Sequence, residues 1–243
     1  MSNILSVKNV SRSFFKGEKV VLDDVSLEIS QGQIFGLVGL NGIGKTTLIK
    51  SIIGLLDLED YEKSSITVDG INIMDFASKK KFCYLPEKFS PSQHLTGIEF
   101  LDVFCSFFGK KITIEEAKNL CKKIELDDQV LYMQTSQCSK GMGQKLGLMS
   151  AFLSDAKLLI LDEPMSGLDP KARIVVKNLM KEYVEKGNSI FFSSHILADI
   201  DEICNEVAIL NDKKIIFKGT CDKFKKEQSD ENLEKAFLKA ITK

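Results

Sequence analysis

A glycine-rich loop at positions 39–47 constrains the fold of this chain more than any other feature of its sequence. The loop reads Gly39-Leu40-Asn41-Gly42-Ile43-Gly44-Lys45-Thr46-Thr47. An apolar run at residues 34–38 precedes it, and apolar residues at helical spacing follow it at 48–53. A buried strand, a glycine-rich turn and a helix start therefore come in immediate succession, the context in which the pattern G-x-x-x-x-G-K-[ST] is meaningful.

The chemistry of phosphate binding explains this spacing. Glycines let backbone N–H groups turn toward an anion without obstruction by Cβ atoms, and the following helix directs the positive end of its dipole at the same anion. Lys45 is placed to reach the β- and γ-phosphates of a nucleotide, and the Thr46 hydroxyl to bind Mg²⁺. We predict that residues 39–47 bind a nucleoside triphosphate; the alternative is a chance match in a glycine-containing turn.

Composition limits the class of protein. With 243 residues, 44% of them hydrophobic and 28% charged, the chain has the make-up of an ordinary globular protein with one large α/β domain. The net charge of −1 gives no reason to expect a nucleic acid partner. Six cysteines without a C-x-x-C pair fit reduced thiols in the cytosol. No apolar stretch approaches the length of a membrane span, so we expect another chain to bring the protein to any membrane.

The order of predicted elements indicates a nucleotide core with an antiparallel sheet and a helical subdomain attached to it. Residues 4–10 and 25–29 alternate like strands, a turn is expected at 17–19, and Asp69-Gly70 marks a hairpin tip. These pieces predict an antiparallel sheet beside the nucleotide core. Residues 91–152 change to helical periodicity, which predicts a helical subdomain whose phenylalanines at 104, 107 and 108 belong to its core.

The second half of the chain returns to the core. Short apolar runs at 158–161 and 190–192 lack alternation, as parallel strands covered on both faces do. A helical pattern at 172–184 separates them, so the core should be βαβ-wound. A late hairpin is predicted at 207–217, and a short amphipathic helix at 233–241.

Polar side chains follow both apolar runs. The first run leads into Asp162 and Glu163, and the second, extended by two serines, leads into His195. Because the carboxyl ends of parallel strands open onto the ligand crevice, we expect all three side chains near the nucleotide. Asp162 is suited to hold Mg²⁺ through water, Glu163 to activate the attacking water, and His195 to hydrogen-bond the γ-phosphate. An ordinary acidic strand end is the alternative for the carboxylates.

Ser139 stands at a predicted helix start, in front of Lys140-Gly141-Met142. Its hydroxyl, the Gly141 amide and the helix dipole together are able to bind an anion. Taken alone, a helix-capping serine is the favoured interpretation. His94 lies in a polar loop and is expected to be a surface residue.

Together these motifs resemble the ATP-binding-cassette (ABC) ATPase family, in the family's order and over nearly the whole chain. Residues 39–47 look like its Walker A, with Lys45 taking part in catalysis. Residues 158–163 look like its Walker B, with Glu163 at the position of the catalytic glutamate. Residues 166–169 resemble the D-loop, and His195 resembles the switch histidine.

Three further positions carry the resemblance with departures. Residues 138–142, Cys-Ser-Lys-Gly-Met, occupy the place of the family signature Leu-Ser-Gly-Gly-Gln and keep its serine and second glycine. Residues 84–87 occupy the Q-loop, where Glu87 replaces the usual glutamine. That carboxylate is able to bind Mg²⁺ through water but would repel phosphates if it approached them unpaired. Phe14 falls where an aromatic ring commonly stacks on adenine, with adjacent Phe15 as the alternative.

The resemblance implies an α/β fold: a P-loop NTPase (RecA-like) core with an antiparallel β subdomain and an inserted α-helical subdomain. The expected single domain, residues 1–243, has its β subdomain and nucleotide core at about 1–90 and its helical subdomain at about 91–152. The second part of the core is expected at about 153–220, and a C-terminal tail at about 221–243.

The resemblance also implies a function: hydrolysis of ATP with Mg²⁺ by two nucleotide domains packed head to tail, each ATP lying between one Walker A and the partner's Ser139 and Gly141. The Tyr-Leu-Pro-Glu and Ser-Lys-Gly-Met segments look like the branch serving ABC-2 type bacterial export permeases. We therefore expect an ATPase subunit on the cytoplasmic face of a membrane, driving export through a separate permease chain, as a homodimer or a heterodimer.

Two other functions are considered. The first is a soluble ABC ATPase acting in translation or DNA repair; such members usually carry two cassettes or long coiled coils, which this chain lacks. The second is a nucleotide-gated binding module without hydrolysis, which the retained Glu163 and His195 argue against. The transported substrate is left open, because the permease would select it.

Overall fold

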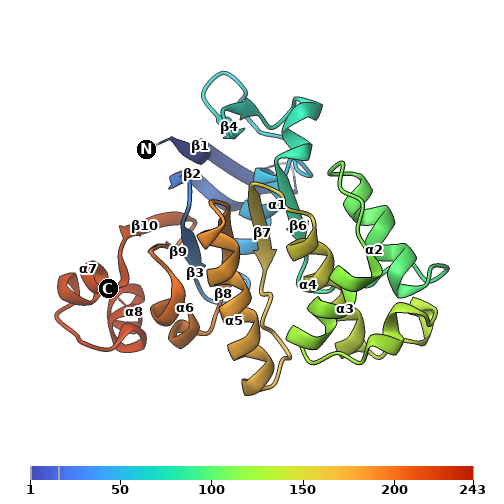
Figure 1. Cartoon of the computed structure of the whole chain (residues 1–243). Helices are drawn as coiled ribbons and strands as arrows, with labels where there is room; N and C mark the ends of the chain where they lie inside the picture. Colours follow the sequence, from blue (N-terminus) through green and yellow to red (C-terminus); the bar gives the residue numbers. More distant parts are fainter. Residues whose placement is uncertain (1, 16, 243) are drawn as a thin grey trace.

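Two β-sheets organise the molecule, and the helix after the phosphate loop lies between them (Figure 1). The computed structural model describes residues 2–15 and 17–242. The antiparallel sheet has the order β2 (Lys19–Ser30), β1 (Asn3–Phe14), β4 (Ser65–Val68) and β5 (Ile71–Asn72). The second sheet has the order β10 (Lys214–Gly219), β9 (Glu206–Asn211), β3 (Ile34–Val38), β8 (Ser189–Ser194), β7 (Leu158–Asp162) and β6 (Phe82–Leu85).

The second sheet is parallel apart from one edge strand. Strands β9, β3, β8, β7 and β6 run parallel to their neighbours, and only β10 pairs antiparallel, as a hairpin with β9. Both predicted hairpins are therefore confirmed, since β4 and β5 also pair antiparallel across Asp69-Gly70. The two sheets are linked at one corner, where the Asp23 N–H donates to the Lys213 carbonyl over 2.9 Å.

The continuous apolar runs reflect a sheet that is covered on both faces. Every residue of β3 is buried, and its side chains alternate between two cores. Phe35 and Leu37 pack with the antiparallel sheet and α1 (Lys45–Ile52), whereas Ile34 and Val38 pack with the helices of the opposite face. A strand of this kind needs apolar side chains in both directions, so it shows no polar alternation.

Helices cover the sheet and extend it sideways. In Figure 1, α2, α3 and α4 form a lobe on the right, α5 and α6 lie across the front of the sheet, and α7 and α8 pack on the left. Their bounds are α2 (Gly97–Ser106), α3 (Ile114–Lys123), α4 (Lys140–Leu153), α5 (Pro170–Glu185), α6 (Leu197–Ile203), α7 (Cys221–Glu227) and α8 (Leu233–Ile241). Short 3₁₀ turns occur at η1 (Phe76–Lys80), η2 (Asp128–Leu131) and η3 (Thr135–Gln137).

Local sequence signals set where the lobe helices begin. Thr96 and Glu99 form a reciprocal capping box at the start of α2, and Thr113 and Glu116 form another at α3. Each box satisfies two backbone N–H groups that a helix start otherwise leaves without partners. Within the described ranges, no helix is both long enough and apolar enough to cross a bilayer.

One expectation about the lobe is wrong. Phe104 and Phe108 are partly buried against the main core, but Phe107 is 45% exposed. Phe107 keeps helical backbone angles and lies one turn after Val103, which is 59% exposed, so it continues the outward face of α2 and stands edge-on to the exposed ring of Phe76.

Candidate active site

The carboxyl ends of β3, β7 and β8 meet at one edge of the sheet and enclose a cleft of about 300 Å³. This edge is where a parallel sheet offers a ligand site, because the loops that follow neighbouring strands converge there. Ten residues line the cleft: Asn41, Gly42, Gly44, Lys45, Thr46, Thr47, Glu87, Asp162, Glu163 and His195. Most of the residues predicted to bind nucleotide or metal are thus brought together.

The phosphate loop adopts a backbone that favours glycine. Gly42 and Gly44 have φ of +78° and +119°, in the region that side chains with a Cβ rarely adopt. At Gly39 the constraint is space, because a Cβ there would lie 2.8 Å from the Leu210 carbonyl oxygen. The glycines therefore let the loop wrap over the end of the sheet with its amides toward the cleft, as an anion site requires.

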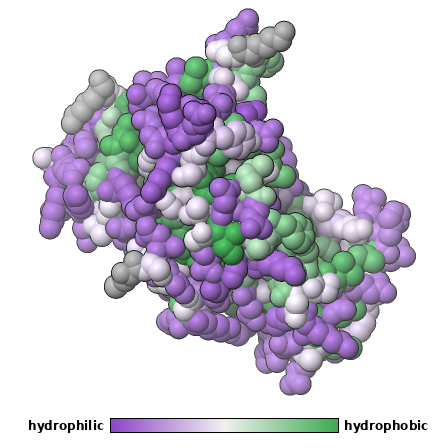
Figure 2. Space-filling model, turned by 90° about the horizontal axis from the view of Figure 1, so that it is seen from above, coloured by the Kyte–Doolittle hydropathy of each residue, from purple (hydrophilic) through white to green (hydrophobic). Residues whose placement is uncertain are grey.

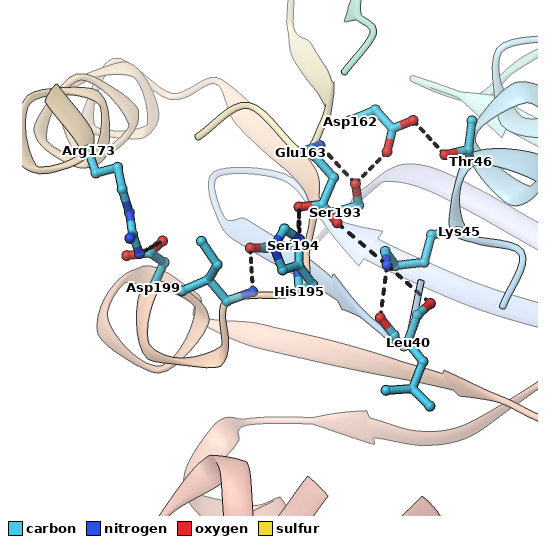
Figure 3. A network of polar contacts seen from close by, with 12 residues as sticks. Leu40, Lys45, Thr46, Asp162, Glu163, Arg173, Ser193, Ser194, His195 and Asp199 are labelled. Carbon is cyan, nitrogen blue, oxygen red and sulfur yellow. Dashed lines mark hydrogen bonds and ion pairs between the residues drawn. The ribbon is translucent and has the colours of Figure 1, made fainter. Parts of the chain in front are cut away.

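Lys45 is buried beneath the loop, with 7% of its surface exposed. Its Nζ donates to the Gly39 carbonyl over 2.8 Å and to the Leu40 carbonyl over 3.4 Å. The same atom lies 3.5 Å from Glu163 Oε1. Figure 3 shows the ammonium between the loop and the carboxylate. It is therefore held at the floor of the cleft, where phosphate oxygens are able to compete for its protons.

Asp162 is fixed on both carboxylate oxygens (Figure 3). Its Oδ2 accepts from the Thr46 hydroxyl over 2.8 Å, and its Oδ1 accepts from the Ser193 hydroxyl over 2.6 Å. Ser193 in turn accepts the backbone N–H of Glu163 over 3.0 Å. The adjacent hydroxyl and carboxylate oxygens are hard ligands of the kind Mg²⁺ prefers, and Mg²⁺ usually takes only one or two carboxylates besides phosphate and water. This donor set fits Mg²⁺ held together with a nucleotide.

A metal held by protein alone is not supported. Within residues 2–15 and 17–242, no three side chains of His, Cys, Asp or Glu converge as a metal cage.

Glu163 and His195 form a second fixed pair. His195 Nδ1 lies 2.8 Å from Glu163 Oε2, and the His195 backbone N–H donates to the same oxygen over 3.3 Å. Glu163 has φ of +49°, a left-handed conformation that is uncommon for a residue with a side chain. Its other oxygen, Oε1, is buried and has no hydrogen bond. Oε2 is thus anchored by His195, whereas Oε1 has no hydrogen bond and faces only the Lys45 ammonium, 3.5 Å away.

An ion-pair network behind the cleft holds the segment after His195. Asp199, in α6, is 3% exposed and pairs with Arg173 over 2.5 Å and with Lys177 over 3.4 Å, both in α5. The Ser194 hydroxyl accepts the N–H of Ile196 over 3.0 Å (Figure 3). These contacts fix the start of α6 and hence the loop that carries His195.

Three predicted positions of the loop, Gly39, Leu40 and Ile43, do not line the cleft. Leu40 is 49% exposed and contributes only its carbonyl to Lys45. Ile43 packs against the core that includes α1, and it is the side chain nearest to the Cβ position of Gly39. Their side chains support the loop rather than lining the site, which agrees with neither being a phosphate ligand.

Phe14 and Glu87, the other predicted nucleotide and metal ligands on this side of the molecule, have no contact that tests their roles. Phe14 ends β1 outside the cleft lining, with the Arg12 guanidinium 5.2 Å from its ring centre, and neighbouring Phe15 is 74% exposed. Glu87 lines the cleft wall but makes no hydrogen bond or ion pair with Thr46 or Asp162. Adenine stacking by Phe14 or Phe15 and metal binding by Glu87 stay predictions.

Ser139 and Gly141 lie at the exposed start of α4, away from the cleft that holds Glu163. The Ser139 hydroxyl accepts the N–H of Met142 over 3.3 Å, so it does cap the helix as the conservative interpretation expected. Within one chain, these two residues contribute nothing to the lining of the cleft.

Sequence reasoning missed Ser193 and the Arg173–Asp199 pair. The signal for Ser193 was weak but present: a serine at the polar end of an otherwise apolar strand, next to residues already suspected of chemistry. Nothing in the sequence connects Arg173 with Asp199, because their contact joins two helices that pack only in the folded chain.

Comparisons with known proteins agree with this geometry. Residues 22–166 match the family model described as ABC transporter. The chain is 36% identical over 227 residues to an uncharacterized ABC transporter ATP-binding protein of Synechocystis sp., covering 90% of this chain and 63% of that protein. It is 34% identical over 229 residues to the ABC-type transporter ATP-binding protein EcsA of Bacillus subtilis, covering 93% and 90%. It is 31% identical over 218 residues to the Nod factor export ATP-binding protein I of Sinorhizobium fredii, covering 88% and 62%.

A solved structure of the ATP binding subunit of an ABC transporter superimposes with a TM-score of 0.88 at 31% identity, covering 99% of this chain and 100% of that one. The predicted α/β fold is thereby confirmed. The chain spans less than two thirds of the Synechocystis and Sinorhizobium relatives that it matches. From the family match, the relatives and the fold together, the chain belongs to the ABC transporter family.

Proposed function

We propose that this chain is the ATP-hydrolysing subunit of a membrane exporter, working under a permease on a separate chain. The observation that carries the proposal is the state of Glu163: a buried carboxylate with one oxygen anchored by His195 and the other without a hydrogen bond, facing Lys45. A general base needs a proton-accepting atom that is free and fixed in position. His195 fixes the carboxylate in position, and Oε1 would become free once phosphate oxygens draw the Lys45 ammonium away from it.

ATP would bind with its phosphates against the amides of residues 41–47 and the start of α1. Lys45 would exchange the carbonyls of Gly39 and Leu40 for phosphate oxygens, which is favourable because a charged acceptor makes a stronger hydrogen bond than a carbonyl. Thr46 and Asp162 would hold Mg²⁺, which supplies neutralising charge to the phosphates when bound. Ser193 keeps Asp162 oriented through its 2.6 Å hydrogen bond.

Hydrolysis would follow from the Glu163–His195 pair. Glu163 Oε1 accepts a proton from, or orients, a water in line with the γ-phosphate, while Oε2 stays on His195. His195 is 45% exposed in its side chain, so it is able to reach the γ-phosphate while Nδ1 remains on the carboxylate. Lys45 stabilises the charge that develops on the transferred phosphoryl group.

The site is half of a working unit. Ser139 and Gly141 carry the exposed amides and positive end of α4 but lie outside their own chain's cleft. A second nucleotide domain packed head to tail would bring these groups to the γ-phosphate from the opposite side, in a homodimer or a heterodimer. Because both chains contact the γ-phosphate only in the closed state, its loss on hydrolysis would release the pair.

An apolar groove offers the contact with the permease. It measures about 480 Å³ and lies between η1 and the end of α2, where Phe76 is 68% and Phe107 45% exposed. Leu55, 66% exposed, adds to it from the segment after α1. Figure 2 shows exposed hydrophobic residues between the body and the right-hand lobe. An exposed apolar patch with charged surroundings fits a short amphipathic segment of a membrane partner on the cytoplasmic face.

The proposal is tested by two linked measurements. The purified chain should hydrolyse ATP with Mg²⁺, and Glu163→Gln should abolish turnover while retaining ATP and trapping a dimer. An unchanged rate in that variant would remove Glu163 as the base.

Co-purification from detergent-solubilised membranes tests the partner. A membrane protein should accompany the wild type and be lost in a Phe76→Ser, Phe107→Ser double variant. Leu238→Ser is the matched control. Leu238 is 55% exposed, and it lies on α8, which does not line the groove. Stable association with ribosomes or DNA, without any permease, would overturn the exporter assignment.

A further inference from the structure

A small cavity lies beside the nucleotide cleft and shares one residue with it. It measures about 170 Å³ and lies at the start of α4. Its lining comprises Glu87, Lys88, Lys140, Gly141, Gln144, Ser166, Gly167 and Leu168. Glu87 lines this cavity and the nucleotide cleft alike, so its side chain stands at the wall between them.

Gln144 presents an unsatisfied donor to the cavity. Only 9% of the residue is exposed, and its Nε2 is buried without a hydrogen-bond partner. A buried amide without a partner is costly, so a native structure that keeps one usually gives it a partner in another state. Two other side chains of the cavity are acceptors without a hydrogen bond or ion pair among the described residues: the Ser166 hydroxyl and the Glu87 carboxylate, of which only the carboxylate is charged.

The loop that carries Glu87 rests directly on α4. A Cβ at Gly147 would lie 2.5 Å from the Phe89 ring, and one at Gly143 would lie 3.5 Å from Pro91 Cδ. Gly147 therefore makes room for this loop, and Gly143, one helical turn earlier and next to Gln144, lies in ordinary contact distance of it. Glu87 and Gln144 belong to two segments that are already packed together.

The charges on the two sides of Glu87 differ, and they favour its carboxylate on the cavity side. On the cleft side stand Asp162 and Glu163, and Lys45 is the cation that faces them. The triphosphate of the proposed function would add further negative charge there. The cavity side instead offers Lys88, Lys140 and the positive end of α4, whose first turn contains no acidic residue.

We propose that Glu87 is a positioning residue that docks onto Gln144 and the start of α4 when phosphates fill the nucleotide cleft. Resting on the proposed function, this gives the carboxylate a partner away from the phosphates. The negative charge of the phosphates repels the Glu87 carboxylate from the cleft toward the cavity. There it accepts a hydrogen bond from Gln144, which fixes α4. Ser139 and Gly141 at the start of α4 must contact the nucleotide of the partner chain. Thr46 and Asp162 then hold the metal without Glu87.

A charge-swap series tests the Glu87–Gln144 pair. All variants are made in the Glu163→Gln protein, which should trap the ATP-bound dimer, and dimerisation is measured by analytical ultracentrifugation. Gln144→Glu sets two carboxylates against each other and should weaken dimerisation about tenfold, the size expected for a hydrogen bond to a charged group. Adding Glu87→Gln restores an amide–carboxylate pair and should recover most of that loss. Gln137→Glu adds the same charge at an exposed residue before α4 and should change dimerisation little.

A second series does not depend on burying a charge. Gln144→Leu and Glu87→Gln should each weaken dimerisation, and the double variant should be no worse than the more affected single variant, because both remove one interaction. Additive losses, or no rescue in the charge swap, would overturn the inference. The inference would also be overturned if Glu87→Gln raised the Mg²⁺ concentration needed for ATP binding equally in the presence of Gln144 and of the Gln144→Leu substitution. That result would mean that Glu87 is a metal ligand. Failure of the reference protein to bind ATP would overturn the proposed function, and this inference with it.

Discussion

Replacing Ser193 by alanine should destabilise the protein and loosen Asp162 and Glu163, because Ser193 supports both residues. Ser193 is 0% exposed, and its hydroxyl serves two partners at once: it donates to Asp162 Oδ1 over 2.6 Å and accepts the Glu163 N–H over 3.0 Å. Alanine leaves both without a partner inside the protein. A hydrogen bond to a charged group contributes about 1.5–3 kcal/mol, and an orphaned buried N–H costs about 1–3 kcal/mol. Because relaxation recovers part of the sum, we expect a loss of about 3 kcal/mol.

Ser189→Ala is the matched control. Ser189 lies on the same strand, is also 0% exposed, and its hydroxyl accepts one neutral N–H, from Gly32 over 2.9 Å. Gly32 is exposed, so water is able to replace that partner, and the expected loss is about 1 kcal/mol. For a chain of this length each kcal/mol lowers Tm by about 2–4 °C. The two variants should therefore differ by about 4–8 °C.

Urea denaturation followed by circular dichroism measures these losses, with equal m-values required for the comparison. A functional readout separates the site from the fold: freeing Asp162 Oδ1 should raise the Mg²⁺ concentration for half-maximal ATP hydrolysis by about tenfold or more in Ser193→Ala. Ser189→Ala should leave this value unchanged. Equal destabilisation of the two variants, or an unaltered Mg²⁺ requirement in Ser193→Ala, would refute the supporting role of Ser193.

Two further substitutions probe the two halves of the nucleotide site. Lys45→Ala should abolish ATP binding or weaken it severely, because it removes the cation at the cleft floor and leaves Glu163 Oε1 without its ion-pair partner; unchanged affinity in isothermal titration calorimetry would contradict the phosphate role. Ser139→Ala should lower the free energy of unfolding by about 1 kcal/mol through loss of the α4 cap. It should also impair ATP-driven dimerisation while the monomer still binds ATP, and a loss confined to monomer binding would contradict contact across the dimer.

Several features of the fold were predictable because their causes are local. The phosphate loop needs glycine at Gly42 and Gly44 for positive φ angles, which are set within the loop itself. The hairpin at Asp69-Gly70 and the capping boxes of α2 and α3 are equally local. Asp162, Glu163 and His195 were found for a more general reason: parallel strands end at one edge, so residues after apolar runs meet there.

Other features depend on contacts between distant segments. The strand order places β3 between β8 and β9, which no periodicity in the sequence expresses. Phe107 was expected in the core because it continues an apolar pattern, but it shares the outward face of α2 with the exposed Val103, and only helix packing decides which face is buried. Sequence reasoning considered Glu87 only toward Mg²⁺ and the phosphates, whereas Gln144, which lines a cavity with it, comes from a helix more than fifty residues away in the chain.

The sequence by itself determined that a phosphate-binding loop opens a βαβ-wound core and that two carboxylates and a histidine accompany it. These follow from residue type, spacing and the direction of parallel strands. Only the tertiary structure decided how the groups are held: Asp162 on Ser193, Glu163 on His195 with one oxygen left open, and α6 fixed by the Arg173–Asp199 pair. Orientation depends on hydrogen bonds between strands and helices far apart in sequence, and such contacts leave no local pattern.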